Sequence, residues 1–224
     1  MDVATGGRRI CLLNPNSTAA ATDRMAAIAR ATLGSDWTVE TSTTPDSPAI
    51  IVDEHGLRRA TAAVVALFED GLDPLDGVIV SAFLDPGVTE LKALLAVPVV
   101  GIAGAAMAEA ARHGRFAIAS TTPDLDAAIG RLVAYYGYSE QLAGIHTTKG
   151  DPHEVMGDPV RLEAALETLV REVLAQNDVS AIVIGGGPLA DAARALAARS
   201  PVPIIEPVPA AARALARLLA GEET

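Results

Sequence analysis

The 224-residue sequence contains little cysteine, few aromatic residues and few basic residues relative to acidic ones. Cys11 is its only cysteine, which excludes an intramolecular disulfide, a cysteine-rich zinc site and an iron–sulfur cluster built from this chain alone. Phe, Trp and Tyr make up 3% of the residues, which disfavours aromatic platforms for stacking nucleic-acid bases. The formal net charge of −11 repels phosphate backbones, so nucleic acid is not an expected partner.

The sequence also lacks a long hydrophobic run. Its longest uncharged stretch, Ala93–Ala108, is shorter than a membrane-spanning helix and is interrupted by Pro98, Gly101 and Gly104, which suit a strand-loop-helix passage better. Residues 1–7 show no basic region followed by an apolar stretch, so no signal peptide is expected. We therefore expect a cytoplasmic protein with no membrane partner.

The apolar residues of the sequence occur in short runs. Hydrophobic residues make up 50% of the chain, enough for one sizeable core or for two small ones that share a cleft. Runs rich in Val and Ile alternate with amphipathic stretches, the pattern of parallel strands joined by crossover helices in an α/β fold. Strands are predicted at Arg9–Leu13, Thr38–Thr41, Gly77–Val80, Val99–Ile102, Arg115–Ala119, Gln141–His146, Ala181–Ile184 and Pro203–Ile205.

Capping residues indicate where several helices begin. Helices are predicted after Ser17-Thr18, after Asp85-Pro86, after Thr122-Pro123-Asp124 and after Asp158-Pro159. Asp85 is accordingly interpreted as the N-cap of the helix that directly follows it, in preference to a catalytic carboxylate.

The chain also contains an internal repeat. Gly77–Val80, a helix and Val97–Val100 resemble Ala181–Ile184, a helix and Val202–Ile205. The sequence therefore predicts two similar domains with four-stranded parallel sheets, related by a pseudo-twofold axis. Their predicted boundaries are 1–102 plus 206–224 for the first domain and 103–205 for the second.

The repeat also predicts where a ligand would bind. Open α/β sheets bind ligands beyond the carboxyl ends of their strands, so two such units would share an active-site cleft between them. The segments expected to line this cleft are 14–17, 81–87, 120–123 and 185–189.

Several of these segments carry groups that suit an anion or an amide. Asn14 begins an Asn-Pro-Asn-Ser-Thr segment at a helix N-terminus, which is either a carboxylate site or ordinary turn and cap chemistry. Thr121 and Thr122 add two hydroxyls at the equivalent place in the second unit. Gly185-Gly186-Gly187 has neither the phosphate-loop nor the dinucleotide spacing, but its amides could cradle an anion.

Other residues give weaker signals. No metal-ligand spacing connects the histidines, which are His55, His113, His146 and His153. Ser81 lacks the Gly-x-Ser-x-Gly surroundings of a hydrolase nucleophile. Segment 147–157 is expected to be either a lid or an ordinary solvated connection.

Five segments, in order along nearly the whole chain, resemble the aspartate/glutamate/hydantoin racemase superfamily, and within it the hydantoin and allantoin racemase branch. They are Asn14–Thr18, Phe83–Gly87, Val97–Met107, Arg115–Thr122 and Val202–Ile205. The resemblance implies two α/β domains with the active site between them, no cofactor, a homo-oligomer, and a small carboxylate or cyclic amide such as a hydantoin as ligand.

The resemblance also implies a mechanism that this sequence does not match. In the family, one cysteine removes a proton from a carbon next to a carbonyl and a second delivers a proton to the opposite face. Those two positions are Ala82 and Gly186 here, and Gly104 stands where hydantoin racemases usually have glutamate. The site residues carried over for substrate binding are Asn14, Ser81, Ala82, Phe83, Thr121, Thr122, Gly186 and Gly187.

Three hypotheses remain open on this basis. The first is an isomerase that uses other proton carriers, such as Asp85, His113, His146 or water. The second is a non-catalytic relative that binds a ligand. The third is a diverged decarboxylase or lyase, although the one thiol needed there is also lost at Gly186. Cys11 lies inside the first predicted strand, where a small buried hydrophobe is the expected role.

Overall fold

Two four-stranded parallel sheets organise the computed structural model, which describes residues 7–69 and 74–222. The strands are β1 (Arg8–Asn14), β2 (Trp37–Thr43), β3 (Gly77–Val80), β4 (Val99–Gly101), β5 (Phe116–Ser120), β6 (Leu142–Thr147), β7 (Ala181–Ile184) and β8 (Ile204–Ile205). Their order is β2-β1-β3-β4 in the first sheet and β6-β5-β7-β8 in the second. The α/β class, the two parallel sheets and the eight predicted strands are confirmed.

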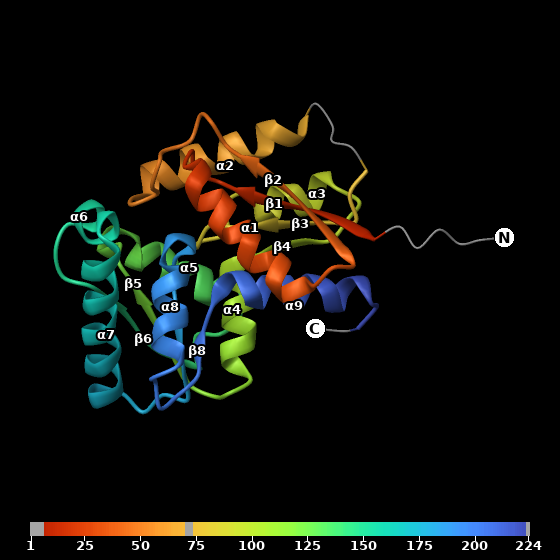
Figure 1. Cartoon of the computed structure of the whole chain (residues 1–224). Coiled ribbons are helices and arrows are strands. Elements are labelled where there is room, and N and C mark those ends of the chain that lie inside the picture. The colour runs from red at the N-terminus through yellow and green to blue at the C-terminus, as the bar shows by residue number, and fades with distance from the viewer. Residues whose placement is uncertain (1–6, 70–73, 223–224) are drawn as a thin grey trace.

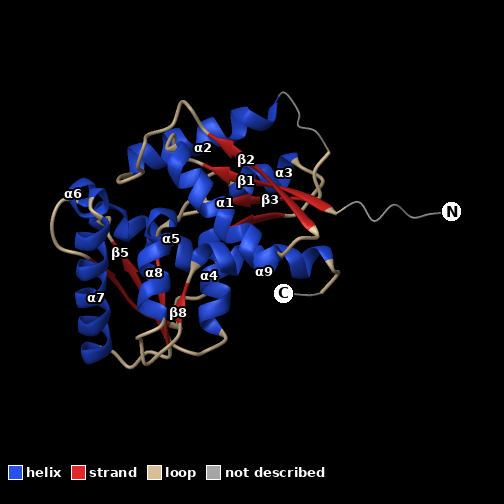
Figure 2. Ribbon diagram, in the orientation of Figure 1, coloured by secondary structure: helices blue, strands red, loops and turns tan. Residues whose placement is uncertain are grey.

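Helices cover both faces of each sheet, so each sheet and its helices form one lobe (Figures 1 and 2). The helices are α1 (Ala19–Leu33), α2 (Glu54–Glu69), α3 (Val88–Leu94), α4 (Ile102–Ala111), α5 (Asp126–Tyr135), α6 (Pro152–Gly157), α7 (Pro159–Gln176), α8 (Ala190–Ala197) and α9 (Pro207–Leu219). Two 3-10 turns, Pro123–Leu125 and Gly187–Leu189, precede α5 and α8. No helix within residues 7–69 and 74–222 is long and apolar enough to cross a membrane.

Alternation along β1 explains how the first lobe buries two apolar clusters. Ile10 and Leu12 face the cluster formed with α1 and α9, whereas Cys11 and Leu13 face the cluster formed with α2 and α3. Successive side chains of a strand point to opposite faces of the sheet, so the apolar run in β1 serves both cores. Cys11 is 4% exposed, which confirms the expected buried position.

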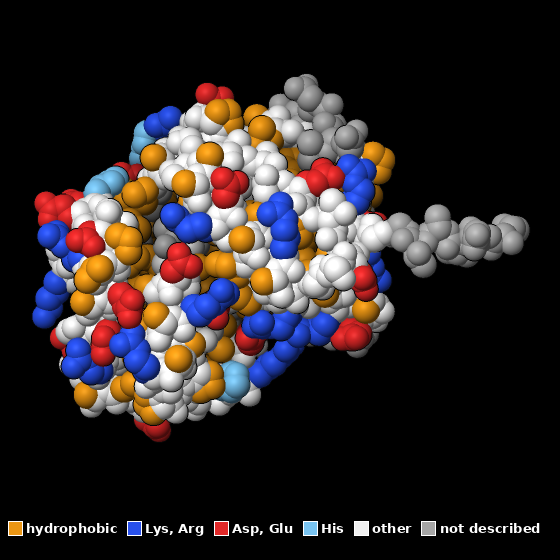
Figure 3. Space-filling view, viewed as in Figure 1, with side chains coloured by type: hydrophobic (Ala, Val, Ile, Leu, Met, Phe, Trp, Pro, Cys, Tyr) orange, Lys and Arg blue, Asp and Glu red, His pale blue; other side chains and the backbone are white. Residues whose placement is uncertain are grey.

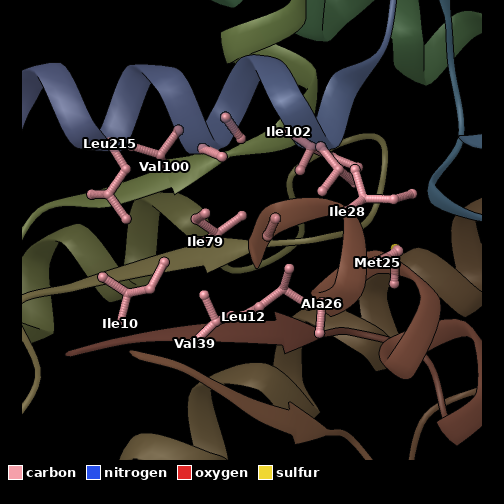
Figure 4. Close-up of a cluster of buried hydrophobic side chains, with 14 of the residues drawn as sticks. Ile10, Leu12, Met25, Ala26, Ile28, Val39, Ile79, Val100, Ile102 and Leu215 are labelled. Carbon is pink, nitrogen blue, oxygen red and sulfur yellow. The ribbon is translucent and has the colours of Figure 1, made fainter. Parts of the chain in front are cut away.

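The chain crosses between the lobes twice. It leaves the first lobe after β4 and enters α4, whose buried residues pack in a cluster with β5 and β7 of the second lobe. It returns to the first lobe after β8, where α9 packs on α1 and β3 (Figure 1). In Figure 4, Leu215 extends from α9 towards the sheet that carries Ile79. The boundaries 1–102 plus 206–224 and 103–205 remain a prediction.

The helix starts are only partly as predicted. Asp158 caps α7 as expected, because its side chain accepts hydrogen bonds from the N–H groups of Val160 and Arg161. The interpretation of Asp85 is wrong: α3 begins at Val88, its N-cap is Gly87 with φ 81°, and no side chain caps it. The carboxylate of Asp85 instead contacts the start of α4.

Candidate ligand site between the lobes

A pocket lies where the loops that follow β3, β5 and β7 meet. Its walls come from both lobes and consist of Asn16, Ile50, Ile51, Ala82, Phe83, Leu84, Ser120, Thr121, Thr122, Leu125, Ile129, Met156, Gly185, Gly186, Gly187 and Leu189. The sequence predicted segments 14–17, 81–87, 120–123 and 185–189 at this place, and each of them contributes at least one lining residue. The cavity volume is about 50 Å³, room for about two water molecules at roughly 30 Å³ each. A ligand the size of a hydantoin therefore requires side chains or lobes to move.

The structure brings most of the predicted site residues together in this pocket. Those that line it are Ala82, Phe83, Thr121, Thr122, Gly186 and Gly187. Asn14 and Ser81 do not line it. Ligand contacts for all eight stay a prediction.

Asn14 is fully buried at the end of β1 and its amide is used for internal structure. Its Nδ2 donates to Asn16 Oδ1 at 3.0 Å, to Thr22 Oγ1 at 2.9 Å and to the Thr18 carbonyl at 3.3 Å. Asn14 therefore orders the turn that leads into α1. Asn16 is the residue of this segment that reaches the pocket. The sequence placed segment 14–17 in the lining but selected Asn14 as the binding residue, because both asparagines suit the same turn.

Ser81 also lies behind the pocket wall. It is 1% exposed, and its hydroxyl donates to the sulfur of Met25 at 2.9 Å. A thioether is a weak acceptor and no base, so this contact does not activate the hydroxyl as a nucleophile.

The glycine loop after β7 is closely covered by apolar side chains. A Cβ added at Gly186 would lie 2.8 Å from Leu189 Cγ, and one at Gly185 would lie 2.9 Å from Phe83 Cε1. A Cβ at Gly187 would lie 2.5 Å from the sulfur of Met25. The space that side chains would need at these three positions is thus already filled.

No carboxylate, imidazole, amine, guanidinium or thiol belongs to the residues that line the pocket. Its polar side-chain groups are the amide of Asn16 and the hydroxyls of Ser120, Thr121 and Thr122. Ser120 Oγ donates to the Gly185 carbonyl at 3.1 Å and lies 3.2 Å from Thr122 Oγ1. The pocket can donate and accept hydrogen bonds, but its side chains cannot transfer a proton as a general acid or base near neutral pH.

Cys11 does not supply the missing thiol. It packs inside the first lobe with Leu13, Val78 and Val80. Burial, and to a smaller extent the negative charge of Glu40, raises its pKa to about 12. The thiol therefore stays protonated near neutral pH and lies outside the pocket.

Asp85 fixes the loop that carries Ala82 and Phe83. Its carboxylate is buried and accepts hydrogen bonds from the N–H of Ala103 at 2.8 Å, the N–H of Gly104 at 2.8 Å and the hydroxyl of Tyr136 at 2.8 Å. The first two donors belong to the first turn of α4, where the helix dipole favours a negative charge. Burial raises the pKa of Asp85 to about 6, although its three hydrogen bonds oppose that shift.

The position of Asp85 requires an unusual backbone conformation at residues 84 and 85 and glycine at two neighbouring positions. Leu84 and Asp85 both have positive φ, at 85° and 51°, a strained region for residues with a Cβ. A Cβ at Gly101 would overlap the carboxyl group of Asp85, and one at Gly104 would lie 2.7 Å from Tyr136 Cζ. At Gly104, where the resemblance led us to expect glutamate, Tyr136 occupies the space.

Segment 147–157 contributes one wall of the pocket. Asp151 caps the short helix α6 through the N–H groups of His153 and Glu154. Met156 on α6 lines the pocket, so part of this segment contacts the site. His113 and His146 lie outside the lining, and within the described ranges no group of three or more His, Cys, Asp or Glu could hold a metal ion.

Fold and site together define a two-lobed α/β protein with a small pocket at the carboxyl ends of its strands. Residues 10–215 match the model of the Asp/Glu/hydantoin racemase family, and the chain belongs to that family.

The similarity to these relatives extends over nearly the whole chain. The hydantoin racemase of Paenarthrobacter aurescens is 31% identical over 223 residues, which cover 95% of this chain and 91% of that protein. The allantoin racemase from Klebsiella pneumoniae superposes with a TM-score of 0.87 at 27% identity and covers 97% of this chain and 90% of its own. The allantoin racemase from Pseudomonas fluorescens gives a TM-score of 0.88 at 25% identity, with 96% and 93% covered.

Proposed function

We propose that the pocket between the lobes binds a small carboxylate or a cyclic amide such as a hydantoin. We further propose that the chain acts on it as a cofactor-independent isomerase, of the racemase or epimerase type, at a carbon next to a carbonyl. The observation that carries the proposal is the pocket itself, which Ala82 lines from one lobe and Gly186 from the other. These are the two positions that carry thiols in the family pattern.

Without those thiols, the proposed reaction depends on stabilising the enolate. Loss of a proton next to a carbonyl places negative charge on the carbonyl oxygen, and fixed hydrogen-bond donors stabilise that charge. The hydroxyls of Thr121 and Thr122 and the amide of Asn16 line the pocket and are the candidate donors. Because no lining side chain titrates near neutral pH, water must carry the proton to and from the carbon.

The composition of the lining also favours one kind of ligand. Transfer of a charged carboxylate into an apolar site is costly unless a cation pairs with it, and no cation lines this pocket. A neutral cyclic amide can use the hydroxyls of Ser120, Thr121 and Thr122 without that cost. A cyclic amide therefore suits this pocket better than a small carboxylate does.

Deuterium exchange in heavy water tests this function. The protein is incubated with a panel of hydantoins, allantoin and acidic amino acids, and deuterium uptake at the carbon next to the carbonyl is compared with protein-free solution. We expect uptake above the blank with at least one cyclic amide. Thr121→Val should slow it on the order of 100-fold, whereas Thr168→Val on the exposed face of α7 should leave it unchanged. No uptake above the blank with any compound would contradict the proposal.

A second candidate function is ligand binding without turnover. The absence of ionisable groups from the pocket lining favours it specifically. It predicts that a cyclic amide raises the melting temperature while its stereochemistry and isotopic composition stay unchanged. A decarboxylase or lyase would instead release a new product, so chromatography of the same incubations separates all three possibilities.

Self-association and a cytoplasmic location also belong to this proposal. Both are expected from the resemblance and from the sequence rather than from the fold. Light scattering of the purified chain and fractionation of cells that express it test them directly.

A further inference from the structure

We propose that a second pocket, on the far side of α4 from β5 and β7, binds a small organic anion with at least two negative charges. It lies where α3, β4, α4, α9 and the residues after α5 meet. Its walls include Lys92, Arg112, Arg217, Tyr136, Tyr138 and Leu218. The cavity volume is about 270 Å³, well above that of the pocket between the lobes.

Three cations line this pocket and no acidic residue does. Lys92 comes from α3, Arg112 from the end of α4 and Arg217 from the last turn of α9. None of the three forms an ion pair within the described ranges, although seven other arginines of the described chain do. The buried carboxylate of Asp85 partly balances the charge of Lys92. In a chain with a net charge of −11, three cations around one pocket nevertheless favour an anionic ligand.

Arg217 gives a more specific indication. It is half-buried, and its Nε is a buried donor without a hydrogen-bond partner among the described residues. An unsatisfied buried donor costs free energy, and an arginine pairs well with a carboxylate or phosphate. An anion at this place would satisfy the donor and neutralise the local charge.

The remaining walls indicate an organic anion rather than a bare ion. Val99, Val100 and Leu218 give the pocket an apolar side, and Tyr136 and Tyr138 add two aromatic rings. A dicarboxylate or a phosphate ester combines charges for the cations with a carbon body for these walls. In Figure 3, Lys and Arg side chains gather below the position of α9, beside the lower end of α4, so cationic groups on this side of the molecule are open to solvent.

The position of Tyr136 connects this pocket to the loop that lines the other one. Its ring forms part of the wall, and its hydroxyl donates to Asp85 Oδ2 at 2.8 Å. An anion that displaces the ring would disturb a contact of the loop that carries Ala82 and Phe83. The second pocket is thus placed to influence the pocket between the lobes.

Titration calorimetry on the full chain tests the proposal, with succinate, citrate and inorganic phosphate as probes and neutral succinamide as the matched control ligand. We expect succinate or citrate to bind and succinamide not to bind. Arg217→Gln and Arg112→Gln should each weaken binding about tenfold or more, because each removes hydrogen bonds to a charged group. Arg24→Gln, an exposed change on α1 outside the pocket, should have no such effect, and Arg217→Lys should retain part of the affinity.

Three results would overturn the inference. They are no binding of any anion at millimolar concentration, equal binding of succinate and succinamide, or equal weakening by Arg24→Gln and Arg217→Gln. The melting temperature of each free variant is measured alongside, and Arg112→Gln gives an independent result where Arg217→Gln does not fold.

Discussion

The loops that follow β3 and β7 occupy equivalent places in the two lobes, but different forces hold them. Loop 81–87 is anchored by the buried carboxylate of Asp85, which crosses to α4 and Tyr136. Loop 185–189 has no buried charge: it receives one side-chain hydrogen bond, from Ser120 Oγ to the Gly185 carbonyl, and Phe83, Met25 and Leu189 pack directly on its glycines. The first loop can therefore be loosened by removing one polar group, whereas the second is sensitive to any added atom.

Removal of the Asp85 carboxylate is the change with the largest expected effect. Asp85→Ala leaves the Ala103 and Gly104 N–H groups and the Tyr136 hydroxyl without their acceptor. We expect a loss of about 2–4 kcal/mol in the free energy of unfolding, because buried donors without partners are costly. Urea denaturation at neutral pH measures it.

Asp191→Ala on α8 is the matched control for that measurement, because Asp191 is exposed and lies in the first turn of its helix. Its expected effect is within about 0.5–1 kcal/mol. Equal losses in the two variants would show that Asp85 does not anchor its loop.

The pH dependence of stability sharpens the same contrast, since loop 185–189 contains no titratable side chain. Asp85 has a pKa of about 6 in the folded protein against 3.8 as the ordinary value. Between these values the folded state keeps a proton that the unfolded chain has lost, so the contribution of Asp85 to stability falls as pH rises from about 4 to 6 and is constant above. The total change is up to about 3 kcal/mol. Unfolding free energies of the wild type and Asp85→Asn across this range measure it, and identical pH slopes would refute the assignment.

Introducing a thiol at each loop should have unequal effects. Gly186→Cys places a Cβ 2.8 Å from Leu189 Cγ, and we expect about 1–3 kcal/mol of destabilisation from overpacking. Leu189→Ala in the same chain should recover part of it. Ala82→Cys adds only a sulfur to an existing Cβ, so we expect a smaller effect. Thermal unfolding measures the stability of each variant. A larger loss of stability in Ala82→Cys than in Gly186→Cys would contradict the expected difference between the two loops.

The smallest effect is expected at Cys11, which lies in the first lobe but outside both loops. With a pKa of about 12 and 4% exposure, its thiol should not react with a thiol-specific reagent until the protein unfolds. Cys11→Ala should leave ligand binding unchanged. Rapid labelling of the native protein, or loss of binding in this variant, would contradict the picture of a structural cysteine.

The strands were predictable because their signal is local. Val- and Ile-rich runs such as Ala181–Ile184 are buried on both faces, as the sequence pattern indicates for parallel strands. The role of Asp85 was not predictable from neighbouring residues, because its partners Ala103, Gly104 and Tyr136 lie 18, 19 and 51 positions away. The capping rule considers only the adjacent helix, so it assigned Asp85 to α3.

The candidate site was predictable in place but not in detail. The internal repeat and the strand-end rule led to the correct loops. These two rules could not decide whether Asn14 or Asn16 reaches the pocket. Asn14 is held away from it by hydrogen bonds to Thr18 and Thr22, and these partners come close only in the folded turn. The crowding of Gly186 by Leu189 is likewise a packing result with no sequence signal.

The return of α9 to the first lobe has a consequence for synthesis on the ribosome. The cluster between the first sheet and α1 includes Val208, Ala211 and Leu215 from the last described helix. Residues between the two crossings are made as one continuous stretch and can pack as soon as they emerge. The lobe whose strands are translated first therefore acquires its complete core last, so a chain that ends before α9 would leave the side of β3 and β4 that α9 covers exposed to water.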